Sequence, residues 1–365
     1  DGDLSVDLAT VNNPADRMAL VSTEPLTHGE AWQPFAAGEV RVGASIGISL
    51  SDGTAADGDT LLKCADLALY RAKAEGRGNY RFFEPEMDVL AQARRSLEID
   101  LRQALVGGQM ELFYQPLVDA EGAGISGFEA LIRWHHPKRG LVSPALFIPL
   151  AEEIGLITAV GGWVLQTACM EAARWPGALK VAVNLSPAQF RSGTLADDVA
   201  NALKASGLAA SRLELEITET VLLQDDESVL ATLHAVRALG VRVAMDDFGT
   251  GYSSLSYLRR FPFDKIKIDQ SFVRGLGEDD EAAAIVRAVA GLGRSLGMAV
   301  NAEGVETPEQ LAALRGVGCG EVQGYLFSKP KPATDVADML LQHGNATMFE
   351  SRGALARSAR TSNTP

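Results

Sequence analysis

From residue 111 onward, the chain repeats a short apolar run that ends in polar residues and is in most cases followed by a helical stretch. Eight such runs are present, and they begin at Leu112, Ile125, Leu179, Leu213, Val241, Asp264, Met298 and Val322. Amphipathic segments such as TLADDVANALKASG and EAAAIVRAVAGLGRSLG lie between most of them. Eight strands with covering helices predict an α/β fold of the TIM-barrel type, in which the active site lies at the C-terminal ends of the strands.

The part of the chain before this repeat has a different pattern of predicted strands and helices. VGASIGISL, around residues 42–50, predicts a buried strand, and TLLKCADLALYRAKAEG predicts an amphipathic helix closed by Gly76. A length of 365 residues has room for two or three folded units. We therefore expect a small α+β unit over residues 1–86, a connecting helix over 87–105, the barrel over 106–345 and a flexible tail over 346–365.

Composition and charge limit the classes of partner. The net charge of −14 argues against binding to a DNA or RNA polymer or to anionic lipid, because Lys and Arg supply most of the affinity for both. An acidic protein can still hold a phosphate substrate if bound cations supply positive charge. No run is long enough to span a membrane.

The cysteines indicate the compartment. Cys64, Cys169 and Cys319 are odd in number, far apart and without CxxC spacing, so the sequence predicts neither a disulfide framework nor a zinc site. A reducing cytoplasm fits best. Because the chain opens with Asp1 instead of Met, the sequence leaves open whether a longer parent has an upstream sensor or membrane region.

Polar residues stand at the ends of seven of the eight predicted strands. They are Glu129, Asn184, Glu216, Asp246, Asp247, Lys267, Glu303 and Gln323. Carboxylates that converge on one barrel mouth raise each other's pKa unless cations neutralise them. Oxygen ligands without Cys or His favour Mg²⁺ or Mn²⁺ over zinc. The adjacent pair Asp246 and Asp247 suits a bridge between two ions about 4 Å apart, the geometry of in-line phosphoryl displacement.

Each of these residues also has an ordinary structural interpretation. A single acid or amide at a strand end is most often a helix cap or a solvated surface group, but seven in phase with a barrel are hard to explain by coincidence. His135 and His136 precede Pro137 and Gly140, so we assign them to a surface loop. DDFGTGYSS lacks the Lys and spacing of a P-loop, and we interpret it as a mobile loop hinged at Gly249 and Gly251.

Several motifs together resemble one family. FEALIRW, VNLSP, ELEITET, MDDFGTGYSSL, KIKID, AEGVE and QGYLFSKP match, in order and spacing, the EAL-domain family of cyclic di-GMP phosphodiesterases. The resemblance covers roughly residues 95–345. It implies a modified TIM barrel with one antiparallel strand, which hydrolyses one phosphodiester of cyclic di-GMP to linear pGpG with two Mg²⁺ or Mn²⁺ ions.

The resemblance also implies residue roles. Glu129, Asn184, Glu216 and Asp246 would hold the first metal, and Asp246 would bridge to a second that Asp247 binds and Glu303 helps to organise. Lys267 would position or deprotonate the attacking water. Glu219 would tether the loop after the double aspartate, with Glu306 as a further outer partner. The substrate or its surroundings would be held by Gln115, Leu131, Arg133 and Gln323, with Arg133 suited to the phosphate.

The leading unit resembles the C-terminal part of a GGDEF domain, which in active form makes cyclic di-GMP from GTP. The resemblance rests on SIGISL and LLKCADLALYRAKAEGRGNYRFF. If residues 1–5 occupy the signature position, Leu4 stands where the metal-binding Glu belongs, and the upstream half is absent from this chain. We therefore expect no cyclase activity, and we hypothesise that in the full-length parent the unit regulates the barrel, through GTP.

Two other functions remain open from the sequence. One is a receptor that binds cyclic di-GMP without cleaving it and signals through the flanking unit. The intact set Glu129, Asp246, Asp247, Lys267 and Glu303 favours the enzyme over this alternative. The other is a TIM-barrel metal enzyme acting on a different phosphate ester. The family resemblance also implies a homodimer.

Overall fold

The computed structural model of the chain describes residues 18–22, 44–50, 58–76, 78–122, 124–222, 227–249, 261, 263–277 and 279–343. Contacts divide the chain into two units, Asp1–Asp100 and Leu101–Pro365. The expectations for the signature at residues 1–5, for the hinge at Gly251 and for the tail after residue 345 fall outside the described residues. In the described part of the chain, no helix combines the length and apolar character that crossing a membrane requires.

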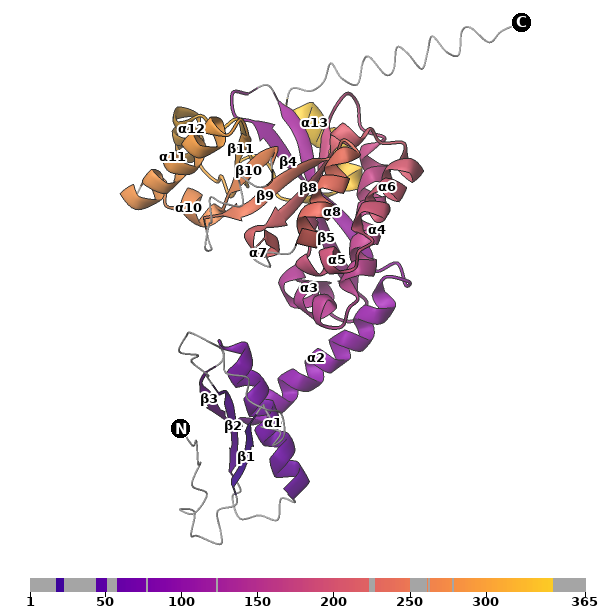
Figure 1. Ribbon diagram of the computed structural model, residues 1–365, viewed down its shortest axis with the longest axis vertical. Helices are drawn as coiled ribbons and strands as arrows, with labels where there is room; N and C mark the ends of the chain where they lie inside the picture. Colours follow the sequence, from indigo (N-terminus) through magenta and orange to yellow (C-terminus); the bar gives the residue numbers. More distant parts are fainter. Residues whose placement is uncertain are drawn as a thin grey trace, which may run out of the picture. The chain divides into compact units, whose positions relative to one another are not determined.

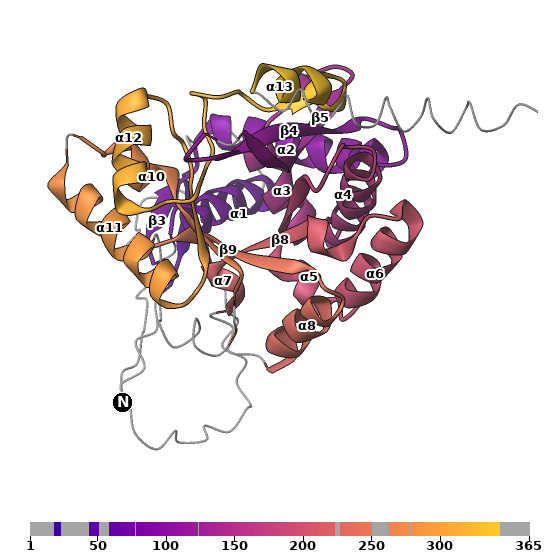
Figure 2. The same ribbon diagram turned by 90° about the horizontal axis from the view of Figure 1, so that it is seen from above.

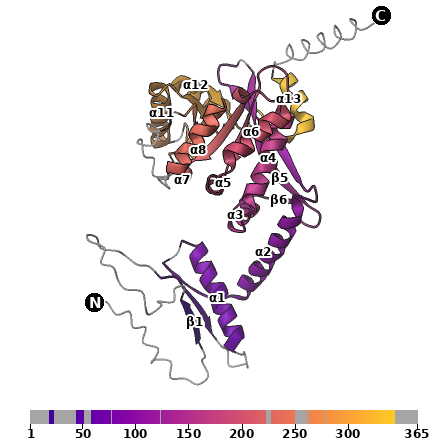
Figure 3. The same cartoon turned by 45° about the vertical axis from the view of Figure 1, so that its right-hand side comes forward.

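The first unit is a small α+β structure, as predicted. Its sheet runs in the order β1 (Met18–Ser22), β2 (Ile46–Leu50), β3 (Tyr80–Phe82), and α1 (Gly58–Ala74) packs against it (Figures 1 and 3). The contact is close at Gly47, where a Cβ would lie 2.0 Å from the carbonyl oxygen of Ala65. Only glycine allows the helix to approach the strand so closely.

Helix α2 (Pro85–Ala104) occupies the segment expected to connect the two parts. The division into the two units falls inside this helix, after Asp100. Our domain boundaries at 86/87 and 105/106 stay predictions.

The second unit is a closed eight-stranded barrel, which confirms the predicted fold class. All eight apolar runs form strands, and these are β4 (Met110–Asp119), β5 (Ile125–His136), β7 (Lys180–Leu185), β8 (Leu213–Thr218), β9 (Arg242–Phe248), β10 (Lys265–Ile268), β11 (Ala299–Ala302) and β12 (Glu321–Val322). Strand β4 closes the barrel by pairing with both β5 and β12, antiparallel in each case, whereas the other neighbours in the ring are parallel. This is the single reversed strand that the family resemblance implies.

Helices surround the strands on the outside (Figure 2). They are α3 (Pro144–Glu153), α4 (Ile157–Ala172), α5 (Pro187–Arg191), α6 (Leu195–Ser206), α7 (Glu219–Leu222), α8 (Glu227–Ala238), α10 (Gln270–Arg274), α11 (Asp280–Ser295), α12 (Pro308–Val317) and α13 (Val336–Gln342). Helix α11 shows why such segments form: Asp279 caps its first turn, and Ala282, Val286, Val289 and Ala290 recur on one buried face.

Strand alternation separates an apolar outer layer from a polar interior. In β8, Leu213, Leu215 and Ile217 belong to the core cluster that also contains helix residues, while Glu214 and Glu216 alternate with them. In β10, Ile266 and Ile268 likewise belong to that cluster, and Lys265 and Lys267 alternate with them. Because side chains point to opposite faces with a period of two, these four charged residues line the inside of the barrel.

Inside the barrel, Lys265 forms a buried ion-pair cluster of its own. Its Nζ pairs with Glu214 Oε1 and Glu321 Oε2, and Glu321 also accepts a hydrogen bond from Ser126. Attraction to the two carboxylates outweighs the effect of burial and raises the pKa of Lys265. This cluster was not predicted from the sequence.

The structure corrects our assignment of His135 and His136 to a surface loop. Both belong to β5, which continues to a tight hairpin with β6 (Gly140–Val142), and only His135 is exposed. His136 is buried beside Trp134, and its Nδ1 accepts hydrogen bonds from the backbone N–H groups of Lys138 and Arg139. The chain turns only at residues 137–139, so the strand continues through both histidines.

Candidate active site

Lys267 lies at the centre of a cluster of carboxylates. Its Nζ is 2.6 Å from Glu216 Oε2, 3.1 Å from Asp246 Oδ1, 2.5 Å from Glu303 Oε1 and 4.0 Å from Glu129 Oε2. The side chain is completely buried. The structure thus brings together, around one cation, acids from the three strands β5, β8 and β9 and from the residue that follows β11.

Burial and neighbouring charges together set the pKa values of the cluster. Burial by itself lowers the pKa of Lys267, but attraction to Asp246, Glu129 and the other acids outweighs it, and the pKa stands well above its usual value. Burial raises the pKa of Glu216 far above its usual value, and repulsion from its carboxylate neighbours adds to the shift. One lysine therefore does not compensate all the negative charge that these acids carry when ionised.

Three amide side chains surround Glu129. Asn184 Nδ2 donates to Glu129 Oε1 at 2.6 Å, and Gln323 Nε2 donates to Glu129 Oε2 at 2.6 Å and to Gln115 Oε1 at 2.9 Å. Gln115 stands opposite Glu129 because β4 runs antiparallel to β5. A residue in the middle of β4 therefore reaches the mouth formed by the C-terminal ends of the parallel strands.

Asp246, Asp247 and Glu303 can direct carboxylate oxygens to within 4.8 Å of one another. Asp247 has φ 53°, the only positive φ of a non-glycine residue in the part of the chain that the structure describes. Its backbone N–H donates to Asp246 Oδ1 at 3.0 Å. This strained conformation turns the second aspartate toward the mouth, although the two are adjacent in a strand.

Glu219 lies at the start of α7, directly after β8. Its Oε1 accepts a hydrogen bond from the backbone N–H of Gly249 at 3.2 Å. The carboxylate therefore holds the second residue after the double aspartate, where we expect a tethering role. Residues 250–260, which follow, lie outside the described part of the chain.

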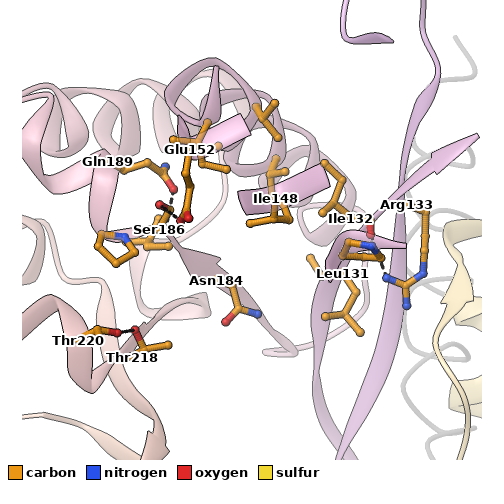
Figure 4. Close-up of a pocket in the computed structure, with 18 residues that line it drawn as sticks. Leu131, Ile132, Arg133, Ile148, Glu152, Asn184, Ser186, Gln189, Thr218 and Thr220 are labelled. Atoms are coloured by element: carbon orange, nitrogen blue, oxygen red, sulfur yellow. Dashed lines mark hydrogen bonds between the residues drawn. The ribbon is translucent and has the colours of Figure 1, made fainter. Parts of the chain in front are cut away.

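Two cavities lie near the cluster, one lined by two of its acids and the other by Asn184, which donates to Glu129. The larger, about 470 Å³, lies between helices α3 and α4 and strands β5 and β7, and Leu131, Arg133, Ile148 and Asn184 line it (Figure 4). The smaller, about 280 Å³, is lined by all four predicted substrate-binding residues, Gln115, Leu131, Arg133 and Gln323, together with Glu129 and Glu303. Leu131 and Arg133 stand between the two cavities.

The residues present fit divalent cations. The donor set contains carboxylate and amide oxygens alone, which suits Mg²⁺ or Mn²⁺. Glu216 Oε1 is buried and has no hydrogen-bond partner among the described residues, a state that is costly for a carboxylate oxygen unless it has a ligand. The site can therefore bind a cation without losing an existing hydrogen bond at this atom.

Comparison with known proteins decides the family. A family model for the EAL domain matches residues 98–330. The chain belongs to the EAL-domain family. A second model, for class-II glutamine amidotransferases, matches only residues 1–55.

Relatives of this EAL chain include named signalling enzymes. It is 44% identical over 336 residues to the bifunctional diguanylate cyclase/cyclic di-GMP phosphodiesterase MucR of Pseudomonas aeruginosa, a match that covers 91% of this chain and 49% of that protein. It is 40% identical over 305 residues to the cyclic di-GMP phosphodiesterase PdeR of Escherichia coli, covering 82% and 46%. The chain thus spans about half the length of these relatives.

A solved structure, the PaMucR phosphodiesterase in complex with c-di-GMP, is similar to the EAL part. It superposes with a TM-score of 0.64 and 46% sequence identity, covering 66% of this chain and 99% of that one.

Asp247 sets an expected pH dependence of cation binding to the EAL site. Burial, with repulsion from Asp246 and Asp269, raises the pKa of Asp247 to about 6. A proton on Asp247 competes with the cation, so Mn²⁺ affinity should rise from pH 5 to pH 7. Calorimetric Mn²⁺ titrations of the wild type and of Asp247→Asn measure this. In the wild type, Mn²⁺ binding below the pKa of Asp247 should release about one proton from this residue, which changes the affinity about tenfold per pH unit. The variant should lack this contribution. Equal slopes for the two proteins would contradict the assignment.

The stability of the cation-free protein should also depend on the ionisation of Asp247, but it should fall as the pH rises. Because the folded-state pKa of Asp247 is raised, its contribution to stability is fully present below the ordinary carboxyl pKa and is lost as the pH rises through about 6. Asp247→Asn should remove this part of the pH dependence of the unfolding midpoint.

Gly324, next to Gln323, allows a close backbone contact in the EAL site. A Cβ at Gly324 would lie 2.0 Å from the carbonyl oxygen and 2.3 Å from the nitrogen of Val305, two residues after Glu303. We expect Gly324→Ala to force these segments apart and to lower the free energy of unfolding by about 1–3 kcal/mol. Denaturant unfolding measures this, with Gly320→Ala as control because a Cβ there meets no atom within 4 Å. Equal stability of the two variants would refute the prediction.

Asp269 borders the EAL site and was not predicted from the sequence. Asp269 caps α10 by accepting from the N–H of Ser271 at 2.9 Å, and it interacts with the carboxyl group of Asp247. Its place two residues after Lys267, at the end of KIKID, is the signal that could have identified it.

Proposed function

We propose that the chain hydrolyses one phosphodiester of cyclic di-GMP to linear pGpG with the help of two divalent cations, Mg²⁺ or Mn²⁺. The observation that carries the proposal is the convergence of Glu129, Glu216, Asp246 and Glu303 on one buried lysine, Lys267. The names of MucR and PdeR, and the c-di-GMP complex of a similar structure, support the choice of substrate.

In this proposal two groups of ligands hold the cations. Glu129, Asn184, Glu216 and Asp246 would hold the first, and Asp246 and Asp247 would hold the second with help from Glu303. Bound cations would supply positive charge to a phosphodiester undergoing in-line displacement. The cluster of Asp246, Asp247 and Glu303 supports this assignment.

Lys267 serves as the proton-holding and water-orienting group. It stays protonated at neutral pH, because the surrounding carboxylates raise its pKa. A protonated Nζ suits the orientation of a water molecule more than its deprotonation.

The cavity walls receive the rest of the substrate. Arg133 lies half-buried between the two cavities, stacked 5.5 Å from the Phe113 ring centroid, and suits a phosphate oxygen. Gln115 and Gln323 orient Glu129 and face the smaller cavity. The apolar wall of the larger cavity, which includes Leu131 and Ile148, suits the face of a purine base (Figure 4).

Incubation of the purified chain with cyclic di-GMP and Mg²⁺ or Mn²⁺, followed by chromatography, tests the proposal. Appearance of pGpG in the wild type and its absence with Glu129→Ala is the expected result. If cyclic di-GMP binds tightly and stays intact with either ion, the protein is a receptor instead. If another phosphate ester is cleaved and cyclic di-GMP does not compete, the substrate assignment is wrong.

We further propose that residues 1–86 are a degenerate remnant of a GGDEF domain without cyclase activity. The match to bifunctional MucR over 336 residues extends well upstream of the EAL family match at residue 98, which supports the relationship. In a longer parent protein, GTP would act on the barrel through this unit, and absence of any GTP effect on the phosphodiesterase activity of that protein would exclude this regulation. A cytoplasmic location and a homodimer complete the proposal, and sedimentation analysis of the chain tests the dimer.

A further inference from the structure

The smaller cavity has a second arginine that our proposed roles do not use. Arg133 of β5 contributes to one part of its lining, and Gln270 and Arg274 of α10 contribute to another. Glu129 and Glu303 line the same cavity. Although the chain has a net charge of −14, two guanidinium groups thus line the space next to its acidic cluster.

The local structure explains how Arg274 reaches this cavity. Helix α10 begins directly after β10, where Asp269 caps it. Gly304, the residue after Glu303, has φ +71°, and a Cβ there would lie 2.5 Å from the Cβ of Gln270. The loop that carries Glu303 and the start of α10 are thus in direct contact. Arg274 follows one helical turn after Gln270 and lies on the same side.

Arg274 is oriented but has donors to spare. Its Nη2 donates to Gln270 Oε1 at 2.8 Å, which directs the guanidinium group along the cavity side of the helix. In the described part of the chain this is its one hydrogen bond to a side chain, and the side chain is exposed. A guanidinium group has five N–H donors in a planar fork, so a bidentate contact to an anion remains possible.

The substrate of the proposed function needs a second anion-binding group. A cyclic dinucleotide has two phosphodiesters, and only one can lie at the cation-binding acids during hydrolysis. The other phosphodiester carries a full negative charge next to an acidic site, so its placement needs a positive partner. Arginine is the side chain best suited to a phosphate oxygen pair.

We propose that Arg274 is a specificity-determining residue that binds the phosphodiester that is not hydrolysed. This inference rests on the proposed function, because it requires a substrate with two phosphodiesters. Arg274 acts on binding and leaves the reacting phosphorus to the acidic cluster and Lys267. The alternative is that Arg274 is a solvated surface arginine without contact to substrate.

Steady-state kinetics on three variants of the full chain test the inference. Arg274→Ala should raise KM for cyclic di-GMP by about 10-fold or more, the effect of losing one charge-assisted hydrogen bond, and leave kcat within about twofold. The KM of Arg274→Lys should lie between those of the wild type and of Arg274→Ala, because lysine keeps the positive charge but lacks the planar fork of N–H donors. Arg287→Ala, an exposed arginine on α11, is the matched control and should leave both constants unchanged.

A substrate with a single phosphodiester separates the possible causes. On bis(p-nitrophenyl) phosphate with Mn²⁺, Arg274→Ala should match the wild type, because no second phosphodiester is present to bind. An equal loss on both substrates would show that Arg274 acts on the acidic cluster, and would overturn the inference. A KM for cyclic di-GMP equal to that of the wild type would also overturn it.

The two proposals fail in different ways. If the wild type does not cleave cyclic di-GMP, the proposed function fails, and calorimetric binding of cyclic di-GMP to wild type and Arg274→Ala still measures the contact. A weaker affinity of the variant by about 10-fold supports the contact in that case, and equal affinities exclude it.

Discussion

Asp246→Asn should reduce the turnover of cyclic di-GMP by about 10³-fold, which corresponds to several kcal/mol of lost transition-state stabilisation. Asp246 is the one acid that we assign to both cations, and its Oδ1 lies 3.1 Å from Lys267 Nζ. The amide has nearly the same shape but lacks the charge that both cations need. The measurement is the initial rate of pGpG formation at saturating Mg²⁺ or Mn²⁺.

The matched control is Glu309→Gln, which removes one carboxylate from the exposed first turn of α12. Its rate should equal that of the wild type, so a general effect of net charge is excluded. Raising the cation concentration should restore only part of the Asp246→Asn activity, because the bridging position itself has changed. A variant that keeps more than about a tenth of the wild-type rate would disprove the bridging role, because such a loss corresponds to less than 1.4 kcal/mol.

Lys267→Met should lower the free energy of unfolding of the cation-free protein by about 3–5 kcal/mol, the usual effect of removing one partner from a buried ion pair. Lys267 is completely buried, and its removal leaves Glu216, Asp246 and Glu303 without their shared counter-charge. Denaturant unfolding in the presence of a chelator measures the loss. Lys204→Met, at an exposed position of α6, is the matched control.

Divalent cations should then reduce the difference between Lys267→Met and the wild type. They bind the folded state and supply the positive charge that the variant lacks, so their stabilising effect should be larger for the variant. The variant should nevertheless stay inactive, because no group remains to orient the water. If cations stabilise both proteins equally, the idea that lysine and cations share the neutralisation of these acids is wrong.

The barrel could be predicted from the sequence because its signal is local. Runs such as LELEIT and KIKID alternate apolar and charged residues with a period of two, and helical segments separate most of them. The same patterns placed the strand-end residues at one mouth. Strand ends were less accurate: β12 begins one residue before the predicted run, at Glu321, and includes only Val322 of that run, and β5 continues to His136. Whether pairing continues depends on the neighbouring strand, which a single run does not reveal.

The site could be predicted only in part by the strand-end rule. Gln115 lies in the middle of β4 and was identified through the family resemblance instead, because its position depends on the reversal of that strand. Lys265, Glu214 and Glu321 were missed as an interior cluster, since each alone is an unremarkable charged residue. Arg274 was missed because it belongs to a helix that packs against the loop after Glu303.

The sequence alone determines the barrel class, the family resemblance and the identity of the acids, because periodicity and residue type are properties of the chain itself. Only the tertiary structure places one lysine among four carboxylates, turns Asp247 through a positive φ and sets a second arginine beside the cavity. The physical reason is that pKa shifts, strain and cavity walls arise from groups far apart in sequence. Their energies exist only once the closed ring of strands has brought those groups within a few ångströms of each other.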